Sequence, residues 1–152
     1  MTGDPFDLMR FLMAQERVIE SALQELRAGV KRGHWMWFIF PQLQGLGHSA
    51  MAQRYAIHSA EEARAYLAHE VLGPRLQACC EALLDAGRDD PTLTALGALG
   101  SPDDLKLRSS MTLFALTADD DAPYRAVLDR YYGGHEDERT VALLRQATAT
   151  KP

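Results

Sequence analysis

Apolar residues recur at three- and four-residue steps along most of this 152-residue chain, in segments bounded by capping residues, prolines and glycines. This spacing is typical of helices that bury one face. In residues 5–28 one stripe contains Leu8, Phe11, Leu12, Val18, Ile19, Ala22, Leu23 and Leu26. Asp4 can cap this segment, Gly29 can end it, and Gln15 is the one polar residue on its apolar face. The pattern predicts a single helix over residues 5–28.

The same start and stop signals predict further helices. Ser59 and Glu62 have the spacing of a capping box, and Ser101-Pro102 and Asp121 precede two more apolar segments. The expected helices cover residues 50–55, a segment from Ser59, 72–87, 92–99, a segment from 102, 123–132 and 138–147. No regular alternation of strands and helices is present, so a parallel-sheet nucleotide fold is not expected. The sequence predicts one all-α domain over residues 1–152, with at most one short strand.

Six large apolar residues follow one another from Trp35 to Phe40. A run that is apolar throughout fits a short buried strand and a buried helical turn equally well. Pro41 ends either structure, because the residue before a proline avoids the helical conformation. Six residues are too few to cross a bilayer, which requires about 20.

Charge and cysteine content restrict the function. The formal net charge is −5, which disfavours nucleic-acid binding because that binding depends on neutralising phosphates. The N-terminal residues show no export signal. The adjacent Cys79 and Cys80 are expected to be small buried residues rather than a redox pair, which usually has Cys-x-x-Cys spacing. We therefore expect a cytoplasmic protein that binds neither nucleic acid nor membrane.

Common cofactor and metal motifs are missing. The chain has no phosphate-binding loop and no His-Glu-x-x-His pair. Residues 45–50 fit a variant of the dinucleotide fingerprint, but no strand–helix–strand unit surrounds them. We expect no metal and no bound cofactor.

Two segments, residues 31–38 and 104–111, combine cations with aromatic or hydroxyl side chains. Residues 27–37 contain Arg27, Lys31, Arg32 and His34 without an acid. Residues 105–118 contain Lys106 and Arg108, again without an acid. Because the whole chain is acidic, these are positive regions on a negative background. If they meet, they can hold a small anionic ligand such as a nucleotide.

Each candidate residue has a predicted role at this site. Lys31, His34, Lys106 and Arg108 are the expected anion contacts. The expected polar positioning residues are Gln15, Gln42 and Ser110, and Trp35 or Trp37 is a stacking wall. Ser109 is a further expected ligand-binding residue. His34 is the first candidate for a general acid or base because its ordinary pKa is near neutrality, and Asp104 is the second.

A structural interpretation explains the same residues. The aromatic run can be core, and Lys31 and Arg32 can stabilise the end of a preceding helix. Ser109 and Ser110 can bond back to the preceding turn, and Arg108 can pair with Asp103 or Asp104. The protein is then a non-enzymatic interaction module. The two interpretations differ in whether segments 31–38 and 104–111 meet around a cleft.

The sequence also resembles the DUF1810 family of small bacterial proteins of unknown function. The shared motifs are 4–8 with 10–11 and 14–15, 34–38 with 40–42, 45–47, 49, 51–53, 55, 57, 62–63, 66–67, 72–76, 101–106 and 109–114. Glu70 departs from the family, which more often has proline there. The resemblance implies a mainly helical fold, and it implies neither an activity nor a catalytic residue. The layout is also similar to that of NADAR domains, which are associated with ADP-ribose chemistry, although no motif is shared.

Overall fold

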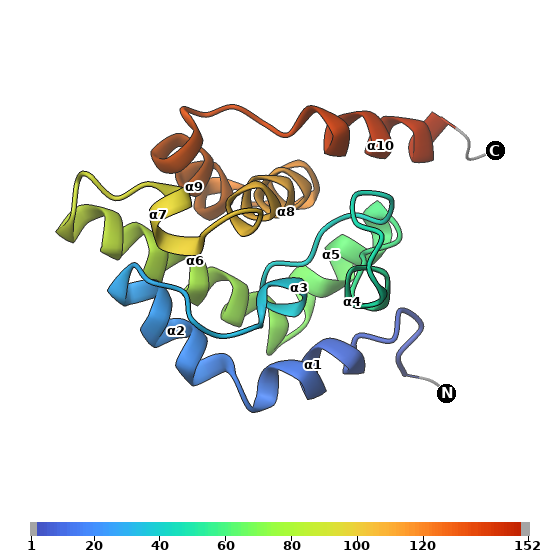
Figure 1. Cartoon of the computed structure of the whole chain (residues 1–152). Coiled ribbons are helices and arrows are strands. Elements are labelled where there is room, and N and C mark those ends of the chain that lie inside the picture. Colours follow the sequence, from blue (N-terminus) through green and yellow to red (C-terminus); the bar gives the residue numbers. More distant parts are fainter. Residues whose placement is uncertain (1–2, 150–152) are drawn as a thin grey trace.

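The computed structural model describes residues 3–149, and this range consists of ten helices joined by loops (Figure 1). The helices are α1 (Met9–Glu16), α2 (Ile19–Ala28), α3 (Met36–Ile39), α4 (Ala50–Arg54), α5 (Ala60–Ala68), α6 (Leu72–Asp89), α7 (Ala95–Leu99), α8 (Asp103–Thr117), α9 (Ala122–Tyr132) and α10 (Glu138–Ala149). Strand-like pairing within residues 3–149 is limited to one bridge between Leu43 and Ile57. The predicted all-α fold class is confirmed.

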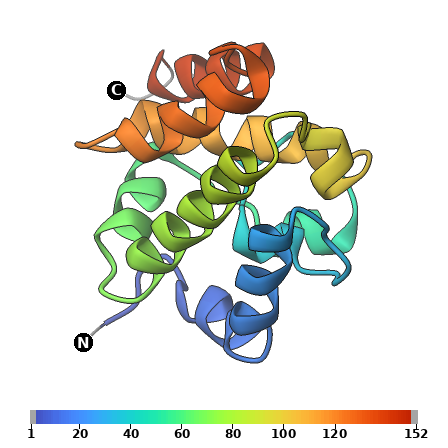
Figure 2. The ribbon, with the colours of Figure 1, turned by 90° about the vertical axis from the view of Figure 1, so that its left-hand side faces the viewer.

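Two helices organise the packing. α6 lies against α2, α5 and α9, and it crosses the centre of the view in Figure 2. α8 lies against α5, α7, α9 and α10. α1 and α10 lie on opposite outer sides of the molecule (Figure 1). None of the helices in residues 3–149 is long and apolar enough to cross a membrane.

The predicted helix over residues 5–28 is wrong in two respects. Asp4 does cap, since its carboxylate oxygens accept from the backbone N–H groups of Leu8 (2.7 Å) and Met9 (3.0 Å), but the helix begins only at Met9. The chain also breaks at Arg17 and Val18. α1 packs on α3 whereas α2 packs on α6, so the two halves of the predicted helix lie against different helices. Gly29 ends α2 in the left-handed conformation, as predicted.

Several predicted helix starts are confirmed and others are not. Ser49 and Ser59 accept hydrogen bonds from the first turns of α4 and α5. Glu62 does not complete the capping box, because its carboxylate accepts from the backbone N–H of His58 instead. Neither Ser101 nor Asp121 acts as a side-chain cap, since α8 and α9 begin without one.

The aromatic run forms a buried helical turn rather than a strand. α3 covers four of its residues, and Trp35, Phe38 and Phe40 are buried while Trp37 is half-buried. Cys79 and Cys80 are buried free thiols, as expected. Burial raises the pKa of Cys79 to about 12, so this sulfur stays a protonated, unreactive thiol at neutral pH.

Arg10 joins the N-terminal segment to α5. One guanidinium N–H lies 2.7 Å from a carboxylate oxygen of Glu62, which is itself 2 % exposed. The other donors reach backbone carbonyls of Phe6, Asp7, Arg54 and Ala56. Glu62 also accepts from the backbone N–H and the ring of His58. The buried carboxylate is therefore held by a cation and by hydrogen bonds, as a buried charge requires.

Replacing Arg10 with methionine is expected to lower the free energy of unfolding by about 3 to 5 kcal/mol, because Glu62 becomes a buried and unpaired charge. Chemical denaturation measures this change. Arg64→Met is the matched control: Arg64 is exposed on α5 and its side chain has no hydrogen bond or salt bridge among the described residues, so its loss is expected to cost less than about 0.5 kcal/mol. Equal losses for the two variants would contradict the structural role of Arg10.

Candidate functional site

The two cationic segments predicted to form a site lie next to one another. Asp103 joins them, because its carboxylate oxygens lie 2.9 Å from Nζ of Lys31 and 3.6 Å from Nζ of Lys106. The Lys106 ammonium also lies 5.2 Å from the centroid of the Trp37 ring, a cation–π contact. Residues 31–38 and the start of α8 therefore meet, although they are far apart in the sequence.

The ammonium of Lys31 is fully engaged in contacts at this junction. Its ammonium donates to the backbone carbonyl of Gly33 at 2.5 Å, pairs with Asp103 and lies 5.0 Å from the centroid of the Trp35 ring. Only 9 % of its side chain is exposed, against 24 % for Lys106. Lys31 and Lys106 thus share the Asp103 carboxylate, and the more exposed of the two cations is Lys106.

Lys106 lines a cavity of about 410 Å³ between the 42–47 loop, the first half of α8 and the start of α10. The lining residues are Gln42, Leu46, Gly47, Pro102, Leu105, Lys106, Arg108, Ser109, Asp137 and Arg139. Four of these, Gln42, Lys106, Arg108 and Ser109, are predicted ligand-binding residues. The volume is within the range of small-molecule sites, about 300 to 1,000 Å³.

Two arginines in this cavity are held by neutral groups. Nε and Nη2 of Arg108 donate to the backbone carbonyls of His135 (3.0 Å) and Glu136 (2.9 Å). Arg139 donates to the carbonyl of Gly45 at 3.3 Å. Within residues 3–149 neither guanidinium forms a salt bridge, so neither is paired directly with a carboxylate. The predicted pairing of Arg108 with Asp103 or Asp104 is wrong.

The carboxylate in the cavity wall, that of Asp137, already accepts hydrogen bonds from Thr140. Oδ2 of Asp137 accepts from the backbone N–H of Thr140 at 3.0 Å and from its hydroxyl at 2.6 Å, and it thereby caps α10. The cavity wall thus carries three cations, Lys106, Arg108 and Arg139, against the carboxylate of Asp137 and that of Asp103, which contacts Lys106 from beside the cavity. In a chain with a net charge of −5, this is a local excess of positive charge.

Comparison with known proteins places the chain in a family. The model of the family described as "Protein of unknown function (DUF1810)" matches residues 5–144. The chain belongs to the DUF1810 family. Its fold is similar to the crystal structure of the conserved hypothetical protein Rv1873 from Mycobacterium tuberculosis, with a TM-score of 0.88 and 56 % sequence identity over 93 % of this chain and 99 % of the other. No curated protein matches the chain.

Three predicted site residues of this DUF1810 protein lie in the core instead of the cavity. The side-chain amide of Gln15 donates to the carbonyl of Phe38 (2.7 Å) and to the hydroxyl of Tyr66 (3.0 Å). The indole N–H of Trp35 donates to Glu25. Ser110 is fully buried, and its hydroxyl has no hydrogen-bond partner in the described structure. None of these three side chains lines the cavity.

The predicted acid–base residues also lie outside the cavity wall. His34 is exposed and lines none of the cavities described for residues 3–149. Asp104 has one buried carboxylate oxygen without a partner among the described residues, and its backbone carbonyl accepts from the Tyr132 hydroxyl. Their catalytic roles therefore stay predictions. The hydroxyl of Ser109 donates to the carbonyl of Leu105, one helical turn earlier, at 3.2 Å, as the structural interpretation expects.

Sequence reasoning missed Arg139. It is the second residue of α10, where the positive end of the helix dipole disfavours a cation. The position of this cation in the first turn of a predicted helix is the sequence signal that could have identified Arg139. A cation at an unfavourable helix position indicates a role other than helix stability. The contact of Arg139 with the carbonyl of Gly45 depends on tertiary folding, which residue spacing does not show.

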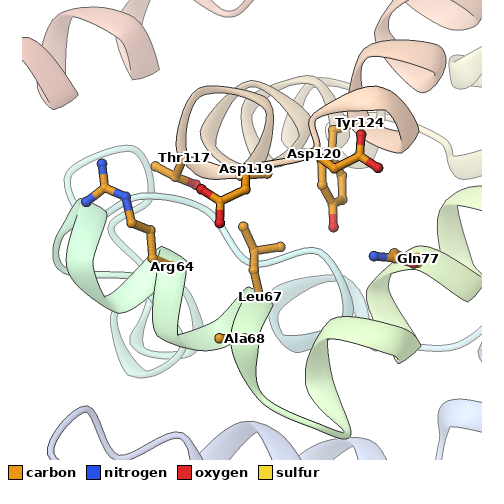
Figure 3. Close-up of a pocket in the computed structure, with 9 residues that line it drawn as sticks. Arg64, Leu67, Ala68, Gln77, Thr117, Asp119, Asp120 and Tyr124 are labelled. Carbon is orange, nitrogen blue, oxygen red and sulfur yellow. The ribbon is translucent and has the colours of Figure 1, made fainter.

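A second cavity, of about 310 Å³, lies between α5, α6 and the loop before α9 (Figure 3). Arg64 is at one end, and Gln77 and Tyr124 face each other at the other end. Asp119 and Asp120 also line it, so its charge does not match the predicted anion. Residues 3–149 contain no group of three or more His, Cys, Asp or Glu side chains suited to a metal ion.

Glu25 fixes the loop that carries Lys31 and His34. One of its carboxylate oxygens accepts from the backbone N–H groups of Arg32 (2.7 Å) and Gly33 (2.9 Å) and from Trp35 Nε1 (3.0 Å). Burial alone would raise the pKa of Glu25, but these hydrogen bonds outweigh it and hold the pKa below the ordinary value of 4.5.

The Glu25→Gln variant is expected to be less stable than the wild type by roughly 1 to 3 kcal/mol at pH 7, because three N–H donors lose a charged acceptor. The lowered pKa means that this contribution is fully present above pH 4.5 and is lost as the pH falls through the folded-state pKa. Denaturation at a series of pH values measures the difference. Glu70→Gln, at an exposed position, is the control. A difference that stays constant down to pH 3 would refute this role.

Proposed function

We propose that the cavity formed by the 42–47 loop, α8 and the start of α10 binds a small phosphate-bearing ligand of the nucleotide or ADP-ribose type. The supporting observation is that Arg108 and Arg139 line this cavity and donate to backbone carbonyls, while neither is paired directly with a carboxylate of residues 3–149. Arginine and lysine are the usual partners of phosphate oxygens. A phosphate supplies further negative charge to a wall in which the cations outnumber the carboxylates.

The apolar part of the wall supports a ligand that also has a flat ring. Leu46, Pro102 and Leu105 line the cavity beside the cations. Leu105 is 59 % exposed, an unusual position for a large apolar side chain of a helix whose other apolar residues are mostly buried. A base or another ring that packs on this surface covers it while the phosphate contacts Lys106 and Arg139.

The proposal concerns binding and includes no reaction. His34 and Asp104 do not line the cavity, so no general acid or base is assigned to a ligand bound there. The alternative, a protein-interaction module, agrees with the burial of the aromatic run but uses the same cations to contact an acidic protein. A concave wall of about 410 Å³ favours the small ligand over a flat protein surface.

Isothermal titration with ADP-ribose and with adenosine tests this proposal. We expect ADP-ribose to bind and adenosine to bind at least tenfold more weakly, because it lacks the phosphates. Lys106→Met and Arg139→Gln are each expected to raise the Kd of ADP-ribose by about tenfold, the effect of losing one charged hydrogen bond of about 1.4 kcal/mol. Arg108 is left unchanged because it also holds the loop before α10.

Arg17→Gln is the matched control, since Arg17 is exposed at the end of α1 and lines none of the described cavities. Its Kd should equal that of the wild type. The absence of binding, or binding of ADP-ribose that neither Lys106→Met nor Arg139→Gln weakens, would refute the proposal.

A further inference from the structure

A separate, largely apolar groove of about 440 Å³ lies between α5, the end of α8 and α10. It is lined by Ala60, Arg64, Leu116, Thr117, Glu136, Val141, Leu144 and Arg145. α10 packs against α8, and the space between α10 and α5 is left as the groove. Leu116 is 39 % exposed there. Its apolar walls suit a hydrocarbon chain.

Two arginines border the groove without a partner. Arg64 on α5 and Arg145 on α10 are both exposed, and in the described part of the chain neither side chain has a hydrogen bond or a salt bridge. Arg75, Arg88 and Arg125, by contrast, each pair with a carboxylate. Arg64 and Arg145 therefore offer two uncompensated charges beside an apolar surface.

The acid that lines the groove is already neutralised. Oε2 of Glu136 lies 2.6 Å from Nη1 of Arg125. The pKa of Arg125 is raised by this bond and by Asp121, so the guanidinium remains charged. The Thr117 hydroxyl is also used, since it donates to the carbonyl of Leu113 at 2.9 Å. The polar groups left free in the groove are thus the two arginines.

From this arrangement we infer that the groove between α5, α8 and α10 binds an amphipathic carboxylate, with an alkyl chain against Leu116, Val141 and Leu144 and its carboxylate at Arg64 and Arg145. The charge complementarity decides the class of occupant: the walls accept a hydrocarbon and the rim accepts an anion. The site shares no lining residue with the cavity of Lys106 and Arg139, so it is independent of the proposed function.

The neighbouring cavity sets the charge of the head group. Arg64 and Thr117 line both hollows, so Arg64 stands at their junction. Figure 3 shows Asp119 between Arg64 and Asp120 along that cavity. Their negative charges oppose a second charge on the ligand. A singly charged carboxylate therefore fits better than a phosphate monoester, which is close to a dianion.

Titration of the ¹⁵N-labelled protein with octanoate, followed by NMR, tests this inference. We expect amide shifts around Ala60, Leu116 and Val141, and weaker binding of 1-octanol and of octyl phosphate. Arg64→Gln and Arg145→Gln are each expected to raise the Kd of octanoate about threefold, the effect of one exposed ion pair. They should leave the Kd of 1-octanol unchanged.

Two further variants make the result specific. Ala60→Phe fills the groove and should abolish the shifts, with the melting temperature measured to show that the chain still folds. Arg17→Gln removes an exposed arginine elsewhere and should bind octanoate as the wild type does. The inference is overturned if octanoate causes no shifts, or if 1-octanol binds equally well. It is also overturned if octyl phosphate binds more tightly, or if both arginine variants keep the wild-type Kd.

Discussion

The burial of α8 on nearly all sides is the constraint on which the rest of the structure depends. Nine of its 15 residues are buried, and α5, α7, α9 and α10 all lie against it. A helix in this position has little polar surface open to water, so its hydroxyl groups need partners inside the protein, and among the described residues only that of Ser110 has none. Ser109, Thr112 and Thr117 do so by donating to the carbonyl four residues earlier. The charged residues of the helix, Asp103, Asp104, Lys106 and Arg108, lie in its first two turns, and its exposed apolar side chains are Leu105 and Leu116.

This arrangement gathers cations at one cavity of a chain whose net charge is −5. Asp103 ties Lys106 to Lys31 and so joins the 31–38 segment to α8. Arg108 and Arg139 are fixed by backbone carbonyls, which orient a guanidinium without cancelling its charge. An arginine held in this way loses little conformational entropy on binding an anion, because its position is set before the ligand arrives. The positive cavity is thus pre-formed by the packing of α8.

The sequence predicted the helical class and most helix ends because these depend on local signals. Gly29, Ser49 and Gly133 mark ends or caps that the structure has. The break at Arg17 and Val18 has no such signal: Phe11, Gln15, Ala22 and Leu26 keep helical spacing across it. That break arises because α1 and α2 pack on different helices, and a single periodic stripe carries no information about its partners.

The candidate site was also predictable only where local signals mark its residues. Local charge identified Lys106 and Arg108, and their position beside Gln42 in one cavity agrees with that expectation. Composition could not separate Trp35, a core residue that donates to Glu25, from Trp37, which is half-buried beside Lys106. Nor could it find Arg139, or the carbonyls of His135 and Glu136 that replace the predicted acidic partner of Arg108. These contacts join residues far apart in the sequence, so they depend on tertiary structure.

The most direct measurement of the central claim is the NMR signal of the arginine Nε–H groups during addition of pyrophosphate. If the cavity holds phosphate oxygens, the side-chain signals of Arg108 and Arg139 shift together and saturate with one Kd, while that of Arg17 stays in place. Shifts of equal size at all three arginines, or none at Arg108 and Arg139, would contradict a phosphate site formed by α8 and α10.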